Sequence, residues 1–126
     1  MRRTFTVRMR GITVGWTSLE RPDATAGVAR GAFRPGPGYE LVEPVFRLFA
    51  EAQGETPAHP TDESKLARYR AARDRLGLAL HAPDGALVPT TGIHVADFRA
   101  ERGAEAIEIE VGVADAAALA AIVGGR

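Results

Sequence analysis

Residues 4–19 read TFTVRMRGITVGWTSL, and the alternation of apolar and polar residues in this stretch decides the fold class. Every second residue from Phe5 to Met9 is apolar, and after Gly11 the alternation resumes and continues to Trp16. A period of two residues is typical of a half-buried β-strand, and a glycine between two such runs favours a tight turn. The segment therefore predicts an opening β-hairpin.

The next part of the chain predicts a change from strands to a helix. Arg21-Pro22-Asp23 predicts a turn, residues 27–33 predict a short third strand, and the proline- and glycine-rich stretch 34–38 predicts a break. Apolar residues then recur at steps of three and four, which is the period of an amphipathic helix. They are Tyr39, Val42, Phe46 and Phe49. Pro44 leaves two alternatives, a kink within this helix or the first position of a second one.

A further helix is predicted to begin after Thr61 or Asp62, either of which can cap it, and to end before Gly77. Its inner face is marked by Leu66, Tyr69, Arg73 and Leu76. Beyond Gly77 the apolar period returns to two residues. The elements predicted there are strands at 78–81, 87–88, 93–97 and 107–111, with a turn at 83–85, and a short alanine-rich helix at 115–123.

The order of strands, two helices and strands predicts a single α+β domain over residues 1–126. We expect a mostly antiparallel sheet, made of the N-terminal hairpin and the C-terminal strands, with the two main helices packed on one face. Charge predicts one strand pairing, because Arg8 and Arg10 lie on the polar face of the first strand and Glu108 and Glu110 on that of the last. Opposite charges on neighbouring strands stabilise by about 0.2–1 kcal/mol a pair, so we expect these two strands to be neighbours.

Composition excludes several classes of chemistry. The chain has 126 residues, 16 basic and 16 acidic side chains, and no cysteine. Without cysteine there are no disulfides and no thiolate nucleophiles or metal ligands, and a reducing, cytoplasmic location is expected. The N-terminus lacks the apolar run of a signal peptide, and residues 116–123 are too few to span a bilayer, so no membrane segment is predicted. A single lysine and no asparagine indicate the codon bias of a GC-rich, bacterial genome.

Every histidine is followed three residues later by an aspartate. The pairs are His59 and Asp62, His81 and Asp84, and His94 and Asp97. Imidazole and carboxylate groups bind transition metals, but each aspartate also has a simpler role as a helix cap, a turn residue or a strand-end polar group. On a strand, positions three apart face opposite sides, so His94 and Asp97 should not converge. We expect no metal and no cofactor, and His81, His94 and Asp97 remain candidate catalytic residues.

Other catalytic and phosphate-binding motifs are missing from the sequence. Neither Ser18 nor Ser64 lies in a G-x-S-x-G turn. The glycines of residues 31–38 match neither a Walker loop nor a dinucleotide-binding loop, and the prolines among them remove backbone amides that would approach a phosphate. These observations favour a rigid connector at 31–38 and argue against a serine hydrolase.

Some residues are candidates for contact with a partner. They are Trp16, Leu119, Ile122, Arg68 and Arg75. Trp16 has the same parity as Ile12 and Val14, which favours packing in the core over a place at an interface. The apolar stretch 116–123 can dock on its own domain or on a partner. Arg68 and Arg75 lie on one face of the helix at 62–76, which suits phosphates, but acids in the same helix and the neutral chain weigh against nucleic acid.

No motif in the sequence specifies a reaction or a family. The absence of catalytic signals favours a non-enzymatic protein-interaction module of the immunity, adaptor or accessory type, with another protein as partner and no membrane contact; a homo-oligomer is compatible. One alternative is a small enzyme or ligand-binding protein with a pocket near His81 and His94. The other is nucleic-acid binding through the basic helix 62–76. A pocket with converging polar groups would favour the first alternative, and salt-sensitive retention on heparin the second.

Overall fold

The computed structural model describes residues 4–53, 62–113 and 116–123 of the chain. The strands are β1 (Phe5–Met9), β2 (Ile12–Thr17), β3 (Arg21–Asp23), β4 (Val28–Pro35), β5 (Leu78–His81), β6 (Leu87–Val88), β7 (Thr90–Asp97) and β8 (Ile107–Val113). The helices are α1 (Tyr39–Ala52), α2 (Glu63–Leu76), α3 (Arg99–Arg102) and α4 (Ala116–Val123). In the described ranges no helix combines the length and the apolar character that crossing a membrane requires.

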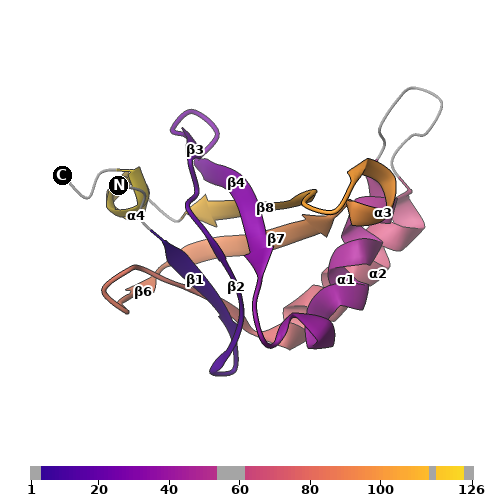
Figure 1. The fold of residues 1–126 in the computed structure, drawn as a ribbon. Coiled ribbons are helices and arrows are strands. Elements are labelled where there is room, and N and C mark those ends of the chain that lie inside the picture. Colours follow the sequence, from indigo (N-terminus) through magenta and orange to yellow (C-terminus); the bar gives the residue numbers. More distant parts are fainter. Residues whose placement is uncertain (1–3, 54–61, 114–115, 124–126) are drawn as a thin grey trace.

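The strands pair antiparallel in the order β6-β5-β1-β2-β4-β8-β7, and β3 pairs with β4. Because β5 and β7 also approach each other, the sheet curls until its two ends nearly meet. In Figure 1, β1, β2 and β4 pass in front of β7 and β8, α1 and α2 lie together at one end, and α4 lies at the other. This arrangement confirms the predicted α+β class, with two main helices beside a mostly antiparallel sheet.

The predicted opening hairpin is confirmed, and its turn explains its register. Phe5 pairs with Thr17 at the open end, and Met9 pairs with Ile12 beside the turn. The two residues between them, Arg10 and Gly11, both have positive φ, 51° and 85°. A two-residue turn of this kind matches the right-handed twist of the flanking strands.

A β-bulge within this hairpin changes which residues face the core. Val7 pairs with Gly15 but Arg8 pairs with Thr13, so Val14 is an extra residue on β2. An extra residue reverses the alternation of faces beyond it. Val14 is fully buried, whereas Trp16 is half-buried on the outer side. The prediction that Trp16 shares the core face of Val14 is therefore wrong.

The segment between β2 and α1 differs from the prediction in two places. Arg21-Pro22-Asp23 was predicted to form a turn, but it forms the short strand β3, in which Arg21 pairs with Arg30. The break predicted at residues 34–38 begins later, because β4 continues through Pro35. A proline can end a strand, since its missing amide is then not needed by the ladder.

Helix α1 is one helix that contains Pro44, so the alternative of a second helix beginning there is excluded. The proline removes one backbone hydrogen bond, the one to the carbonyl of Glu40. Both residues lie on the exposed side, away from the sheet. The opposite face carries the buried side chains Tyr39, Val42, Phe46, Ala50 and Ala52.

Helix α2 has the ends that the sequence predicts. The side chain of Asp62 accepts a hydrogen bond of 3.0 Å from the backbone amide of Lys65, which caps the N-terminus. Gly77 ends the helix in the left-handed conformation, with φ of 64°. Tyr69 is the buried residue of its inner face, and Arg73 lies beside it, half-buried.

The strand pairing predicted from charge is wrong. β1 lies between β2 and β5, whereas β8 lies between β4 and β7. The acids of β8 find another arginine, because Arg30 on β4 pairs with Glu110 and places its Nε 2.8 Å from the carboxylate. The predicted rule of opposite charges across neighbouring strands holds, but alternation alone does not show which strands are neighbours.

The core fills the inside of the curled sheet and continues under both helical ends. Phe5, Val95 and Ile109 are among its buried side chains, and Phe46 enters it from α1. Ile122 of α4 belongs to the same cluster and is 4% exposed. The C-terminal helix therefore packs on its own domain. A smaller cluster, built around Ala50, Ala96 and Phe98, lies where α1 covers the other face of β7.

Candidate functional site

Strand β7 carries two of the three candidate catalytic residues, and it directs them to opposite faces. Val95 and Asp97 face the core, whereas His94 and Ala96 face the other way. Alternation along a strand causes this separation and confirms the prediction that His94 and Asp97 do not converge. The two residues therefore belong to different environments.

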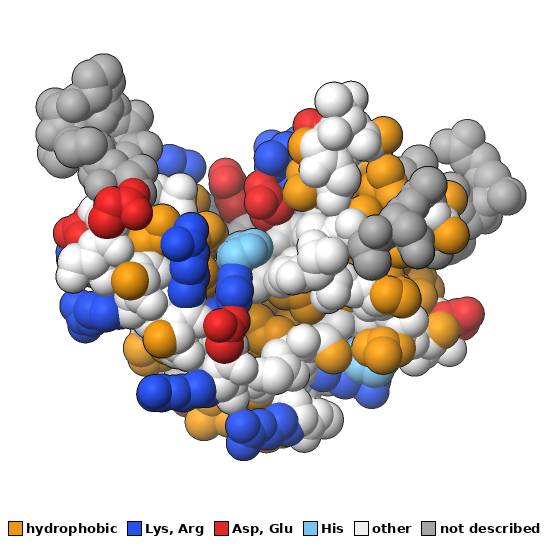
Figure 2. Space-filling view, turned by 180° about the vertical axis from the view of Figure 1, so that it is seen from behind, with side chains coloured by type: hydrophobic (Ala, Val, Ile, Leu, Met, Phe, Trp, Pro, Cys, Tyr) orange, Lys and Arg blue, Asp and Glu red, His pale blue; other side chains and the backbone are white. Residues whose placement is uncertain are grey.

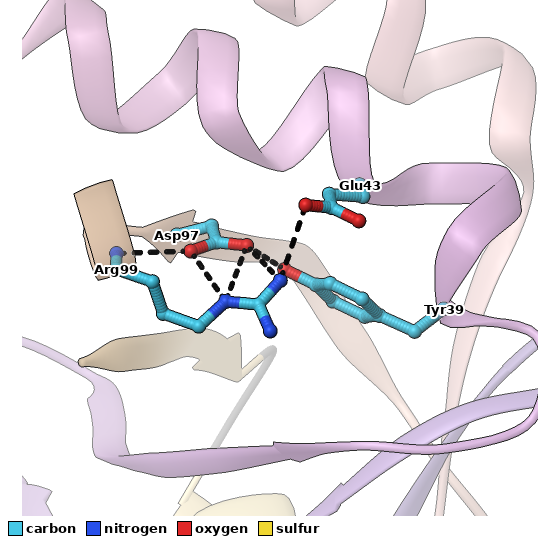
Figure 3. Close-up of polar contacts among 4 residues, drawn as sticks. All are labelled: Tyr39, Glu43, Asp97 and Arg99. Atoms are coloured by element: carbon cyan, nitrogen blue, oxygen red, sulfur yellow. Dashed lines mark hydrogen bonds and ion pairs between the residues drawn. The ribbon is translucent and has the colours of Figure 1, made fainter. Parts of the chain in front are cut away.

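Asp97 is the centre of a buried hydrogen-bond network at the end of β7 (Figure 3). The hydroxyl of Tyr39, from the start of α1, donates to Asp97 Oδ2 over 2.7 Å. Arg99 donates from Nε to Oδ1 over 3.0 Å and from Nη2 to Oδ2 over 2.8 Å, and its backbone amide also donates to Oδ1. Glu43 binds the same guanidinium at 3.2 Å. The network ties β7 to α1 and α3.

The protonation states of this network suit a structural role. Burial opposes ionisation of Asp97, but hydrogen bonds from Arg99 and Tyr39 outweigh burial and hold the pKa of this carboxyl below its usual range. Burial and the hydrogen bond to Asp97 raise the pKa of Tyr39 far above its usual range. Both carboxylate oxygens already accept hydrogen bonds within the protein, so Asp97 has little capacity left for a substrate.

His81 lies apart from the other candidates, on β5. Its Nδ1 is 3.2 Å from the carbonyl of Gly85, and Asp84 accepts a hydrogen bond from the amide of Ala86, so this pair builds the turn after β5. The structure does not bring His81 and His94 to one cavity. His59 lies outside the described residues. Among the residues that the structure does describe, no group of three histidine or acidic side chains could hold a metal ion.

His94 is held by side chains of α2 and α1. The Tyr69 hydroxyl lies 3.1 Å from Nδ1, and Nη1 of Arg73 lies 2.8 Å from Nδ1 and 3.1 Å from Nε2. Phe49 stacks on Tyr69, with ring centroids 4.3 Å apart, and lies 5.6 Å from the histidine ring. An arginine can only donate, so a hydrogen bond from Nη1 needs one of the two ring nitrogens to accept, which a neutral imidazole allows and a protonated one does not.

The electrostatics of this cluster keep both of its titratable rings uncharged. Burial and then the positive charge of Arg73 lower the pKa of His94. Burial raises the pKa of Tyr69 to about 12, although Arg73 opposes the shift. At neutral pH the cluster therefore presents one hydroxyl and one neutral imidazole beside a single permanent cation.

A pocket with a volume of about 180 Å³ opens beside His94. It is lined by Arg21, Arg30, Phe49, Gln53, His94, Ala96, Phe98, Glu108, Ile109 and Glu110. Arg30, Glu110 and His94 are direct cross-strand partners on β4, β8 and β7, so they form a row across the floor. Figure 2 shows a hollow on this face, where a histidine lies among acidic and basic side chains.

A second cavity, of about 240 Å³, lies beside Arg73. It is lined by Arg73, Asp74, Gly77, Leu78, Thr90, Thr91, Gly92 and Ile93. Gly92 lets the histidine ring lie close, because a Cβ there would be 3.2 Å from Nε2 of His94. Arg73 thus borders the second cavity and contacts His94, which borders the first.

Sequence reasoning found His94 but missed most of the residues around it. Tyr69 and Arg73 were assigned to the inner face of their helix, and Phe49 to the apolar stripe of α1. The arginine was the available signal, because a cation four residues after a buried tyrosine needs an acceptor on the element against which it packs. Which strand would supply that acceptor depends on the sheet order.

The candidate partner residues are spread over the molecule. Arg68 and Arg75 are exposed on α2, and the carbonyl of Arg75 accepts a hydrogen bond from Arg10 over 2.9 Å. Trp16 lies on the outer side of β2, with Arg34 above its ring. Leu119 is half-buried, and Ile122 lies in the core. The protein-interaction module stays a prediction, and Ile122 is not accessible to a partner in this arrangement.

Acid is expected to destabilise the fold through His94. Its pKa is lowered in the folded state, so its contribution to stability is complete above the unfolded value, about 6.5, and is lost as the pH falls through the folded value. The protonated ring would face Arg73 and Arg70, opposed by Glu110 and Asp74. Urea unfolding between pH 5 and 8 should show a fall in the free energy of unfolding toward pH 5.

The contribution of His94 is isolated by two matched variants. His94→Gln should flatten the decline below pH 6.5, whereas His81→Gln, at the turn after β5, should leave the profile of the unmodified protein. Identical profiles for His94→Gln and the unmodified protein would contradict the role assigned to Arg73.

The fold and the pocket define a small α+β protein with an open site between α1 and the face of the sheet that carries Arg30, Glu110 and His94. The chain matches no known family model, no curated protein and no solved structure.

Proposed function

We propose that this chain is a binding protein whose pocket beside His94 holds a small zwitterionic molecule with a flat apolar part. The supporting observation is that one cavity is lined by His94, by two phenylalanines, Phe49 and Phe98, and by side chains of both charges. Tyr69 and Arg73 hold the histidine from α2, outside this lining. A concave site with an apolar wall and a few fixed polar groups is the usual form of a small-molecule site.

The charges of the lining favour a ligand with both signs. Arg21 and Arg30 approach the cavity from β3 and β4, and Glu108 and Glu110 from β8. These charges balance, and the histidine at the floor is neutral, so a net charge on the ligand would gain little. Arg30 and Glu110 already pair with each other over 2.8 Å, so a ligand would extend this pair, with a carboxylate beside Arg21 and Arg30 and an ammonium group beside Glu108 and Glu110.

The apolar walls and the volume of the pocket restrict the class of ligand further. The half-buried ring of Phe49 offers a surface against which a planar or aromatic group can stack, whereas Phe98 is 5% exposed and has Arg102 over its ring. The volume of about 180 Å³ is below the roughly 300–1,000 Å³ of sites for drug-sized ligands. An aromatic amino acid has the size and the distribution of charge that this pocket suits.

The arrangement favours binding over catalysis. The described lining contains no serine or threonine that could act as a nucleophile. Arg73 lies against both nitrogens of His94, and a general base needs one of them free to reach the proton that it removes. His94 is therefore better placed to form part of the floor of the pocket than to transfer a proton.

Ligand-observed NMR with phenylalanine, N-acetylphenylalanine and phenylalanine amide tests the proposal. Phenylalanine should bind, and protein-observed spectra recorded beside the ligand spectra should show a shift of the ring resonances of His94. Each derivative lacks one charge, and a lost charge-assisted hydrogen bond of about 1.5–3 kcal/mol should weaken binding tenfold or more. Equal affinities for all three compounds would contradict the zwitterion, and absence of any shift at His94 would contradict the pocket.

Two histidine variants provide the control. His94→Ala should abolish or weaken phenylalanine binding by about tenfold, since it removes a polar group from the floor of the pocket. His81→Ala removes the same side chain from the turn after β5 and should bind like the unmodified protein. Thermal unfolding of both variants shows whether the fold is retained.

A further inference from the structure

A row of side chains crosses the outer face of the sheet, on the side of β1, β2 and β4. Direct cross-strand partners connect Arg34 to Trp16, Trp16 to Thr6, Thr6 to His81 and His81 to Leu87. The bulge at Val14 is the reason why Trp16 joins this outer row. With strands about 4.8 Å apart, the five positions span about 19 Å.

The row is accessible along its length. Arg34 is exposed, Leu87 is 64% exposed, and the three residues between them are half-buried. Arg34 lies 5.9 Å above the centre of the Trp16 ring, in a cation–π arrangement. A half-buried indole has one edge fixed by its neighbours and still presents surface for stacking.

The strands that carry this row have basic side chains, and one acid, Glu20, lies beside β4, where it accepts a hydrogen bond from the amide of Ala32. Strands β1, β2, β4, β5 and β6 contain no aspartate or glutamate. Arg8 lies on the same outer face, two residues from Thr6, and Arg10 follows it in the turn. Within the described part of the chain, neither Arg8 nor Arg34 forms an ion pair.

We propose that this outer row, Arg34–Trp16–Thr6–His81–Leu87, binds single-stranded nucleic acid, with a base stacked on Trp16 and phosphates held by Arg34 and Arg8. An aromatic ring on an open sheet face, flanked by unpaired arginines, supplies the two interactions that single strands use. This site is independent of the pocket at His94. It also differs from the basic helix α2, in which acids offset the arginines.

Anisotropy of a fluorescent twelve-nucleotide oligothymidine, titrated with the full chain at low salt, tests this site. Binding should weaken with added salt, and emission of Trp16, the single tryptophan, should be quenched by the unlabelled oligonucleotide. Trp16→Ala should reduce affinity about tenfold, as expected for loss of one stacked base. Arg34→Gln should lower the salt slope by about one.

Arg68→Gln is the matched control, because it removes an exposed arginine from α2 and leaves the sheet unchanged. It should bind like the unmodified chain, and circular dichroism should show that all variants keep the fold. Loss of affinity with Arg68→Gln but not with Arg34→Gln would overturn the assignment to the sheet. Absence of salt-sensitive binding, or equal binding of duplex and single strand, would overturn the proposal itself.

Discussion

Asp97→Ala is expected to lower the free energy of unfolding by about 3 kcal/mol. The substitution would leave the buried Tyr39 hydroxyl without its acceptor and would remove the three hydrogen bonds that the Arg99 side chain donates to Asp97. Removing one partner of a buried pair costs about 3–5 kcal/mol. The lower end applies here because the Arg99 side chain is 29% exposed and keeps Glu43.

Urea unfolding at pH 7 measures this loss, and Asp84→Ala is its control. Asp84 also accepts a backbone hydrogen bond, but in an exposed turn, so its removal should cost less than about 1 kcal/mol. If Asp97→Ala does not fold, Tyr39→Phe removes only the hydroxyl and should cost about 1–2 kcal/mol. Similar small losses for Asp97→Ala and Asp84→Ala would show that the network contributes little to stability.

The elements that local chemistry specifies could be predicted from the sequence. The hairpin around Gly11 follows from alternation and from a turn that needs positive φ. Helix α2 begins at Asp62 and ends at Gly77, because a carboxylate can cap an N-terminus and glycine can adopt the left-handed conformation. These signals act over three or four residues, so one sequence is enough to find them.

Features that depend on distant strands could not be predicted in this way. At the bulge, β2 has one more residue than β1 between two successive pairs, and the extra residue is Val14. The sequence of β2 alone shows only unbroken alternation, so it does not reveal the extra residue. The strand pairing predicted from charge failed for the same reason. Arg8 and Arg30 are both arginines on the polar face of a strand, so the sequence does not distinguish them as partners of an acid. The order of strands in the sheet decides which of them meets Glu110.

The candidate site contains features that could be predicted from the sequence and features that could not. Alternation along β7 correctly separated Asp97 from His94, and the structure gives each a distinct environment, a saturated network for the first and a pocket for the second. Their surroundings come from helices that are remote in the sequence. Tyr69 and Arg73 reach His94 because α2 packs beside α1, and that packing was not encoded in any short motif.

Gly15→Ala is expected to lower the free energy of unfolding by about 2–3 kcal/mol. A Cβ at this position would overlap the ring of Phe33 and the backbone carbonyl oxygen of Arg34. The ring is buried in the core, and the carbonyl belongs to the neighbouring strand β4, so neither can move away freely. Overpacking typically costs 1–3 kcal/mol, and the backbone contact places this site at the upper end.

Gly112→Ala is the matched control in the urea-unfolding comparison. A Cβ there would clash with the hydroxyl of Thr91, an exposed side chain that can rotate, and would lie at an ordinary contact distance of 3.8 Å from the amide nitrogen of Gly92, so the loss should stay below about 1 kcal/mol. Adding Phe33→Leu to Gly15→Ala should restore part of the loss, because it relieves the ring contact but not the carbonyl contact. Equal losses for the two glycine variants would mean that β2 and β4 are not as closely packed at Gly15 as the structure shows.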